Sequence, residues 1–364
     1  MKVVVVGGGY AGVSVARALD DVADVVLVEA KDTFVHHAAT LRAAVDPEWA
    51  ETIFIPYDKL LQRGQVVRGT VMRLEGTKVF VSDGTTIEAD AVVLATGTAS
   101  PFPAKLAEDS HEIAGARLSR LHQALRQAKR ALVVGAGGVG VELAGELTSA
   151  YPHLTVVLVE KQDDILPLEP CDPRLRTELR YQLEQRNVEL VLGTSLGYLP
   201  PVDVGVLSPF EVDTKDGRNI QADIWFRCYG SRVASGYLGP EFDQAKRGDG
   251  SLNVDEYLQV VGHPGVFAVG DLAHTPEPDR ADAAVDQGLL VASVLRDIIE
   301  GREPQRTYQP KRRWVLMPLG PEGGACELRD PETGEVQVAG AEETVRIKGE
   351  DLHTTWVRSL LGRD

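Results

Sequence analysis

The feature that most constrains the fold of this chain is a glycine pattern that occurs twice. In KVVVVGGGYAGVSVARALD near the start and in RALVVGAGGVGVELAGEL from residue 130, an apolar run leads through G-x-G-x-x-G into a helical pattern. The glycines of the two copies are Gly7, Gly9 and Gly12, and Gly135, Gly137 and Gly140. One such pattern is weak evidence, but two in the same strand–turn–helix context predict a duplicated dinucleotide-binding unit.

The residues around the glycines explain why this pattern binds a dinucleotide. The first glycine permits a tight turn, the second lets the backbone approach a pyrophosphate, and the third lets the helix pack on the strand. The helix N-terminus then offers unpaired N–H groups to the phosphates. A second apolar run in each copy ends in an acid, Glu29 or Glu160, whose carboxylate can accept the hydroxyls of an adenosine ribose. No GK[ST] follows the glycines, so a nucleotide-hydrolysing P-loop is excluded.

A second repeat supports the duplication. DGTTIEADAVVLATG at 83–97 matches DGRNIQADIWFRCYG at 216–230 with a constant shift of 133 positions. The Asp-Gly pairs predict hairpin turns, and the apolar run after each predicts a buried strand. Each of these strands would deliver a glycine, Gly97 or Gly230, to the ligand crevice.

The chain then returns to its first half. GVFAVGD at 265–271 reads as a strand that ends in Gly270 and Asp271, and a helical pattern follows at 281–300. An aspartate at a strand's carboxyl end is well placed to bind a polyol such as ribitol. We therefore predict an α/β fold with two Rossmann-like domains, the second inserted into the first, and a small α+β C-terminal domain. The predicted boundaries are 1–108 with 240–301, 109–239, and 302–364.

The motifs resemble those of a known superfamily. The two fingerprints, ATG at 95–97 and VGD at 269–271 are similar to those of the two-dinucleotide-binding flavoprotein reductases. Within that superfamily, KDTFVHHAATLRAAVD, LNVDEYLQVVGHPGVFAVGD and KGEDLHTTW resemble the apoptosis-inducing-factor-like quinone reductases of the ferroptosis-suppressor type. The similarity runs over nearly the whole chain, and these three stretches are more specific than the glycine motifs.

The resemblance implies which cofactor each half binds. FAD would lie on the first fingerprint and Glu29, and a nicotinamide nucleotide on the second fingerprint. Further residues implied at the FAD are Lys31, His36, Arg42, Ala95, Thr96, Gly97, Gly270 and Asp271. Glu160 would repel a 2′-phosphate, so we expect NADH rather than NADPH, although the adjacent Lys161 could partly offset this preference.

The cysteines and histidines limit the possible electron acceptors. Cys171, Cys228 and Cys326 form no CxxC motif, so we expect no redox-active disulfide. His36 and His37 are adjacent, and neighbouring residues of a strand face opposite ways. With no third ligand cluster visible, we expect no metal, a packing or FAD-contact role for His36, and a solvated His37.

Two charged residues are candidates for a catalytic role. Glu142, two positions after Gly140, would lie in the first turn of the second fingerprint's helix, where it could simply complement the helix dipole. Lys348 lies in VRIKGEDLH, which alternates like a strand. The resemblance implies that both residues lie close to the nicotinamide–flavin contact, where Lys348 could pair with Glu142.

The net charge and the C-terminal segment indicate which binding partners are compatible with this sequence. The net charge of −16 argues against nucleic acid, and the scattered cysteines favour a reducing cytoplasm. Segment 302–364 is nearly balanced, with 10 Lys/Arg and 11 Asp/Glu. RRWVLMPLG and ETVRIKGEDL read as short strands, and LHTTWVRSLLGRD as an amphipathic helix with Leu352, Trp356 and Leu360 on one stripe. That helix is expected to dock in the core or to make a peripheral contact with the inner face of a membrane.

Three functions remain open at this point. The first is an NAD(P)H:quinone oxidoreductase, in which FAD takes a hydride and passes two electrons to a quinone or a similar small acceptor. The second is a ferredoxin or rubredoxin reductase, and the third an interaction protein whose oligomeric state responds to NADH. The sequence leaves the oligomeric state and the quinone open.

Overall fold

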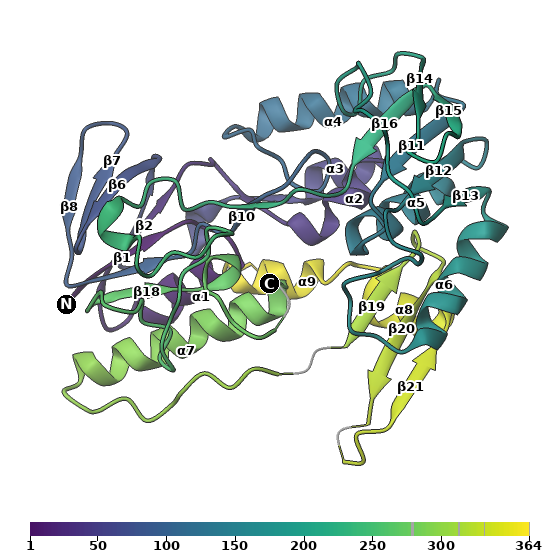
Figure 1. Cartoon of the computed structure of the whole chain (residues 1–364). Coiled ribbons are helices and arrows are strands. Elements are labelled where there is room, and N and C mark those ends of the chain that lie inside the picture. The colour runs from purple at the N-terminus through teal and green to yellow at the C-terminus, as the bar shows by residue number, and fades with distance from the viewer. Residues whose placement is uncertain (278–279, 312–313, 331, 364) are drawn as a thin grey trace.

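The computed structural model describes residues 1–277, 280–311, 314–330 and 332–363. It contains two parallel sheets and a small C-terminal unit. In each parallel sheet, the first strand in sequence leads into one of the two glycine fingerprints. Figure 1 shows the two sheets side by side, with the C-terminal strands beside α6 and with α9 reaching back to α1. The predicted α/β architecture is confirmed.

The first sheet joins segments from both ends of the chain. Its order is β18-β9-β1-β2-β5, parallel throughout. The strands are β1 Lys2–Val6, β2 Asp24–Glu29, β5 Gln65–Arg68, β9 Ala91–Leu94 and β18 Val266–Ala268. Val3 and Val5 face the core under the helices α1 (Tyr10–Leu19) and α7 (Ala281–Ile299), and Val4 and Val6 face the opposite core. Both faces of the sheet are covered, which is why VVVV shows no polar alternation.

The second sheet repeats the first. Its order is β13-β12-β11-β16, again parallel. The strands are β11 Arg130–Val134, β12 Thr155–Val159, β13 Val188–Val191 and β16 Ile224–Arg227, and the helices are α4 His111–Leu125, α5 Gly138–Ala150 and α6 Pro173–Gln185. Because β18 lies in the first sheet and β11, β12, β13 and β16 form the second, the unit built on the second sheet (the nucleotide unit) is inserted in sequence into the unit built on the first sheet (the first unit).

The two Asp-Gly hairpins form as predicted. Gly84 links β7 to β8 with a φ of +89°, and Gly217 links β14 to β15 with a φ of +88°. The hairpin strands are β6 Val71–Glu75, β7 Lys78–Val81, β8 Thr86–Glu88, β14 Phe210–Asp213 and β15 Asn219–Ala222. The short strands β10 (Thr98–Ala99) and β17 (Arg232–Val233) pair where the chain crosses between the two sheets. Between β2 and β5 lie the short elements β3 Phe34–Val35, α2 Thr40–Ala43, α3 Pro47–Thr52 and β4 Phe54–Ile55.

The C-terminal unit corrects one strand prediction. The unit contains β19 Val315–Pro318, β20 Gly324–Arg329, β21 Val336–Ala339, α8 Ala341–Thr344, a π-helical turn Val345–Gly349 and α9 Thr354–Leu360. The strand predicted over 312–320 is observed as β19, and residues 312 and 313 lie outside the described ranges. The stretch 343–352, also predicted as a strand, is instead helical up to Gly349 and then forms a turn. Glu342 and Glu343 complement the helix N-terminus and Glu343 pairs with Arg346, whereas the alternation in VRIK is too short to specify a strand.

The final helix docks on the core through a different stripe from the predicted one. Val357 and Leu361 are fully buried against α1, whereas Trp356 is 37% exposed. Leu352 and His353 have left-handed backbone conformations, so α9 begins only at Thr354 and its buried face is rotated by one residue. Within the described residues, no helix combines the length and apolar character needed to cross a membrane.

Candidate active site

The first fingerprint forms a close turn between β1 and α1. Gly7 has a φ of +102°, and a methyl group there would stand 2.5 Å from the Ala95 carbonyl oxygen. A methyl group at Gly12 would stand 1.9 Å from the Gly7 carbonyl oxygen. At Gly9, apart from its chain neighbours, no described atom would lie within 4 Å of such a group. Gly7 and Gly12 are therefore needed for packing, and Gly9 leaves the backbone open to a ligand.

The second fingerprint has the same geometry. A methyl group at Gly140 would stand 1.8 Å from the Gly135 carbonyl oxygen, and at Gly137 it would again meet no described atom within 4 Å. Helices α1 and α5 begin after Gly9 and Gly137, and neither has a side-chain cap at its N-terminus. Both helix ends therefore present backbone N–H groups at open positions, which fits the pyrophosphate of a dinucleotide.

The two acids are held in equivalent positions. Each carboxylate accepts two backbone N–H groups, one from the glycine loop and one from the residue two positions after the acid. For Glu29 the donors are Gly8 at 2.5 Å and Lys31 at 2.8 Å. For Glu160 they are Ala136 at 2.7 Å and Gln162 at 3.0 Å. Each acid is therefore hydrogen-bonded to its own glycine loop, and the fold brings the two motifs of each half together into one site.

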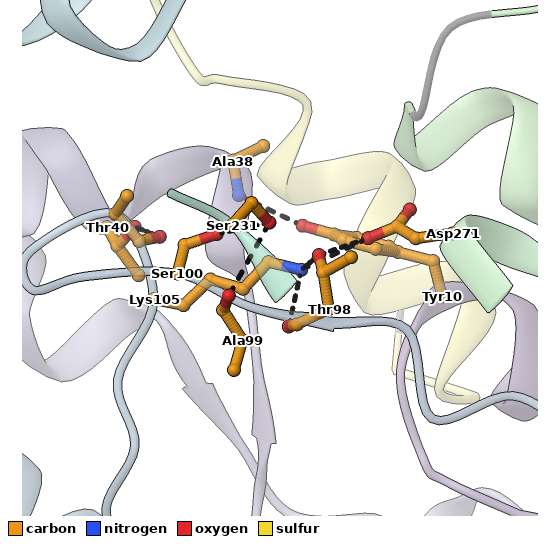
Figure 2. A network of polar contacts seen from close by, with 10 residues as sticks. Tyr10, Ala38, Thr40, Thr98, Ala99, Ser100, Lys105, Ser231 and Asp271 are labelled. Atoms are coloured by element: carbon orange, nitrogen blue, oxygen red, sulfur yellow. Dashed lines mark hydrogen bonds and ion pairs between the residues drawn. The ribbon is translucent and has the colours of Figure 1, made fainter. Parts of the chain in front are cut away.

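Asp271 lies in a polar cluster at the carboxyl ends of β9 and β18 (Figure 2). Its carboxylate accepts the Thr98 hydroxyl at 2.5 Å and the Lys105 ammonium at 3.2 Å. Lys105 also donates to the Thr98 carbonyl at 2.9 Å. Lys105 was not predicted as a site residue, because no motif marks it and its partner is 166 positions away. Together these residues offer hydroxyl, carboxylate and ammonium groups to a polyol or phosphate.

The remaining strand-end residues lie at the same edges. Ala95, Thr96 and Gly97 follow β9, Gly230 follows β16, and Gly270 follows β18. The Gly270 N–H donates to the Gln287 side-chain oxygen at 2.7 Å, which fixes this loop against α7. Gln287 was also missed, because its role depends on how α7 packs.

His36 connects three segments. Its Nδ1 lies 2.8 Å from the Tyr10 hydroxyl and its Nε2 lies 2.9 Å from the Leu352 carbonyl oxygen. Burial lowers the pKa of His36 to about 4, so the ring is neutral at pH 7. Nε2–H then donates to Leu352, and Nδ1 accepts from Tyr10. The structure thus shows a packing role that ties the C-terminal segment to α1, and a direct FAD contact stays a prediction.

His37 differs from its predicted solvated state. It begins a 3₁₀ turn rather than continuing a strand, and its Nδ1 is buried without a hydrogen-bond partner among the described residues. Burial lowers its pKa well below the usual value, and the nearby cations Lys105 and Lys31 lower it further. Lys31 itself donates to the Glu108 carbonyl at 2.8 Å, beside the Glu29 loop.

The Arg42 side chain is buried between three segments of the protein. Its Nε donates to Glu146 at 2.6 Å and its Nη2 to the Gly349 carbonyl at 3.2 Å, and both side chains of the ion pair are only 4% exposed. The guanidinium therefore connects α2, α5 and the C-terminal turn. Its role at FAD stays a prediction.

Glu142 and Lys348 form the ion pair that the sequence analysis considered. Lys348 Nζ lies 2.6 Å from a Glu142 carboxylate oxygen, and each side chain is 16% exposed. Because α5 begins at Gly138, Glu142 lies in its second turn rather than the first. The pair joins the helix of the second fingerprint to the π-helical turn, across 206 positions of sequence.

The three cysteines are free thiols in different environments. Burial raises the pKa of each, and that of Cys228 reaches about 12. Cys326 and Glu327 are neighbours on β20, so their side chains point to opposite faces of the strand. The Cys326 thiol lies on the side of Thr344. Glu327 lies on the other side, where it accepts a hydrogen bond from the N–H of Asp172, the residue that follows Cys171. None of the three is therefore activated as a thiolate. The described residues contain no cluster of His, Cys, Asp and Glu suited to a metal ion.

Comparison with known proteins identifies the family. A family model described as pyridine nucleotide-disulphide oxidoreductase matches residues 1–288. The chain belongs to this family. It is 30% identical over 345 residues to apoptosis-inducing factor homolog A of Dictyostelium discoideum, covering 90% of this chain and 85% of that protein. It is 31% identical over 335 residues to ferroptosis suppressor protein 1 of Xenopus tropicalis, with coverage of 90% and 88%.

A solved structure with the same fold is the sulfide:quinone oxidoreductase of Aquifex aeolicus. The TM-score is 0.79 at 16% identity, covering 99% of this chain and 91% of that one. The relatives of Dictyostelium discoideum and Xenopus tropicalis confirm the resemblance drawn from the sequence, and this structure confirms the fold. This family member is an FAD-dependent oxidoreductase that uses FAD and a nicotinamide nucleotide. The open glycine loops and the Asp271 cluster fit these two ligands.

Proposed function

We propose that the protein is an NAD(P)H:quinone oxidoreductase that works without a redox-active disulfide. FAD, when bound, accepts a hydride from the nicotinamide and passes two electrons on. The observation that supports a mechanism without a disulfide is the state of the thiols. All three cysteines are free, and burial raises their pKa values. A disulfide acceptor requires an attacking thiolate and a resolving thiol. The electrons would then leave the flavin directly to a small acceptor, as the resemblance to quinone reductases implies.

In this proposal the chain's own residues bind, orient and supply charge. The two glycine loops hold the pyrophosphates, and the two acids bind the adenosine riboses. Lys348, held 2.6 Å from Glu142, would provide a positive charge beside the flavin, where it favours the negative charge that develops during reduction. Glu142 in turn keeps the ammonium in place, so both residues are proposed to be catalytic.

The acceptor can be tested by steady-state kinetics. NADH consumption would be followed with a short-chain quinone, an iron–sulfur protein or a small disulfide as the sole acceptor. We expect efficient turnover with the quinone only. Faster turnover with the iron–sulfur protein would replace the proposal with a ferredoxin-type reductase. Reduction by NADH without turnover of any acceptor, together with a change in oligomeric state, would indicate a redox sensor.

We also propose that NADH is preferred over NADPH. Both oxygens of Glu160 are already fixed by backbone N–H groups, so its negative charge cannot swing away from a 2′-phosphate. In Glu160→Gln, we expect the NADH-to-NADPH ratio of kcat/KM to fall by about tenfold, corresponding to about 1.4 kcal/mol. Glu178→Gln, on the neighbouring helix α6, is the control. A ratio unchanged in Glu160→Gln would show that the acid does not set the preference.

A further inference from the structure

A second ion pair, Arg42–Glu146, lies beside the Lys348–Glu142 pair. Glu146 follows Glu142 by four residues on α5, so the two carboxylates lie on one helix face, one turn apart. Arg42 comes from α2, in the opening part of the chain. Its 2.6 Å contact with Glu146 is almost completely shielded from water, unlike the more accessible Lys348 pair.

The two pairs reach consecutive residues of the C-terminal turn. Lys348 binds Glu142 through its side chain, and the next residue, Gly349, accepts a hydrogen bond from Arg42 through its carbonyl. The turn is π-helical, with the Glu350 N–H donating to the Val345 carbonyl at 3.1 Å. Such wide turns are uncommon and often occur at functional sites. Here the turn presents the Lys348 side chain to α5 directly, and it presents the adjacent Gly349 carbonyl to Arg42 of α2, which is itself paired with Glu146 of α5.

A buried charge pair is a costly way to join elements, and apolar side chains of similar volume often serve stability as well or better. What a charge pair adds is directionality, because a guanidinium fixes the positions of the carboxylate and carbonyl oxygens that it binds. Burial raises the pKa of Glu146, opposed by the charge of Arg42. The carboxylate therefore depends on Arg42 to remain charged in this setting.

We infer that Glu146 and Arg42 are positioning residues that hold the turn Val345–Gly349 so that Lys348 reaches Glu142. This inference rests on the proposed function, since it explains how the proposed catalytic lysine is placed. Arg42 bridges the first unit, the nucleotide unit and the C-terminal unit at one buried point. Loss of the Glu146 charge releases Arg42 from α5, and the Gly349 carbonyl then loses its fixed donor.

The test is a double-mutant cycle read in the half-reaction with NADH. Glu146→Gln is compared with the intact holoenzyme, with Lys348→Ala, and with the double variant. The rate of flavin bleaching is followed in stopped flow without any quinone. We expect Glu146→Gln to slow bleaching by about fivefold in the normal background and by less than about 1.5-fold when Lys348 is already alanine. FAD content and the flavin absorption spectrum are recorded for each variant.

A matched control uses another glutamate paired with arginine. Glu189, 51% exposed, pairs with Arg130 at the surface, and Glu189→Gln should leave bleaching unchanged in both backgrounds. If Glu146→Gln fails to fold, Glu146→Asp is used instead, because it keeps the charge but moves it away from Arg42. Its effect on bleaching is expected to depend on Lys348 in the same way. Equal fold-changes in the presence and absence of Lys348 would overturn the inference. Because no quinone is present, failure of the acceptor assignment would leave this result intact.

Discussion

Replacing Lys348 with alanine is expected to leave FAD bound but to slow turnover with NADH and a quinone at least tenfold. The lysine contacts Glu142 at 2.6 Å and the Leu316 carbonyl at 3.4 Å, both outside the two glycine loops that hold the dinucleotides. Its removal takes a positive charge from the proposed reaction site without altering either loop. A tenfold loss corresponds to about 1.4 kcal/mol of transition-state stabilisation.

The measurement combines FAD content, from absorbance after purification, with kcat and kcat/KM. Lys78→Ala is the control, because Lys78 pairs with Glu88 on a surface hairpin and its loss should change neither quantity. Lys348→Arg keeps the charge and should recover part of the rate. Turnover of Lys348→Ala equal to that of the unaltered protein would falsify the catalytic assignment, and loss of FAD would show a binding role instead.

Two alanine substitutions in the second fingerprint, Gly140→Ala and Gly137→Ala, are expected to impair the protein in different ways. At position 140 the new methyl group would meet the Gly135 carbonyl oxygen at 1.8 Å, and backbone cannot give way as a flexible side chain can. Helix α5 must then move away from β11. We expect the free energy of unfolding to fall by about 3 kcal/mol, and activity to fall further because α5 carries Glu142.

At position 137 the methyl group meets no described atom within 4 Å, and the residue has an ordinary φ of −70°. The fold should therefore be unaffected, while the methyl group stands where a pyrophosphate approaches the backbone. We expect KM for NADH to rise about tenfold with no change in the thermal midpoint. Thermal unfolding and KM are measured for both variants. Equal destabilisation by the two substitutions would contradict this division of roles.

Local signals explain what the sequence could predict. The glycine turns, the Asp-Gly hairpins and the buried strands each depend on residues within a few positions of one another, so their patterns could be interpreted directly. The turn that carries Lys348 was predicted as a strand, because five residues are too few to separate two periodicities. The buried face of α9 differs from the predicted one because Leu352 and His353 adopt left-handed backbone conformations, and no local sequence pattern predicted these conformations.

Long-range contacts explain what the sequence could not predict. Lys105 gains its role from Asp271, and Glu146 from Arg42, 104 positions away. The resemblance implied that His36 and Arg42, in the stretch KDTFVHHAATLR, lie near the flavin. In the structure both residues bind carbonyls of the C-terminal segment, at Leu352 and Gly349. The stretch thus connects the first unit to the turn that positions Lys348.

A single anaerobic turnover tests whether electrons leave the flavin directly to a quinone. The purified holoenzyme is reduced with one equivalent of NADH until the flavin absorbance is bleached, and one equivalent of a short-chain quinone is then mixed in. We expect the oxidised flavin spectrum to return rapidly with formation of one equivalent of quinol, and the three free thiols to remain unchanged. Reduced flavin that persists in the presence of quinone would contradict such a transfer.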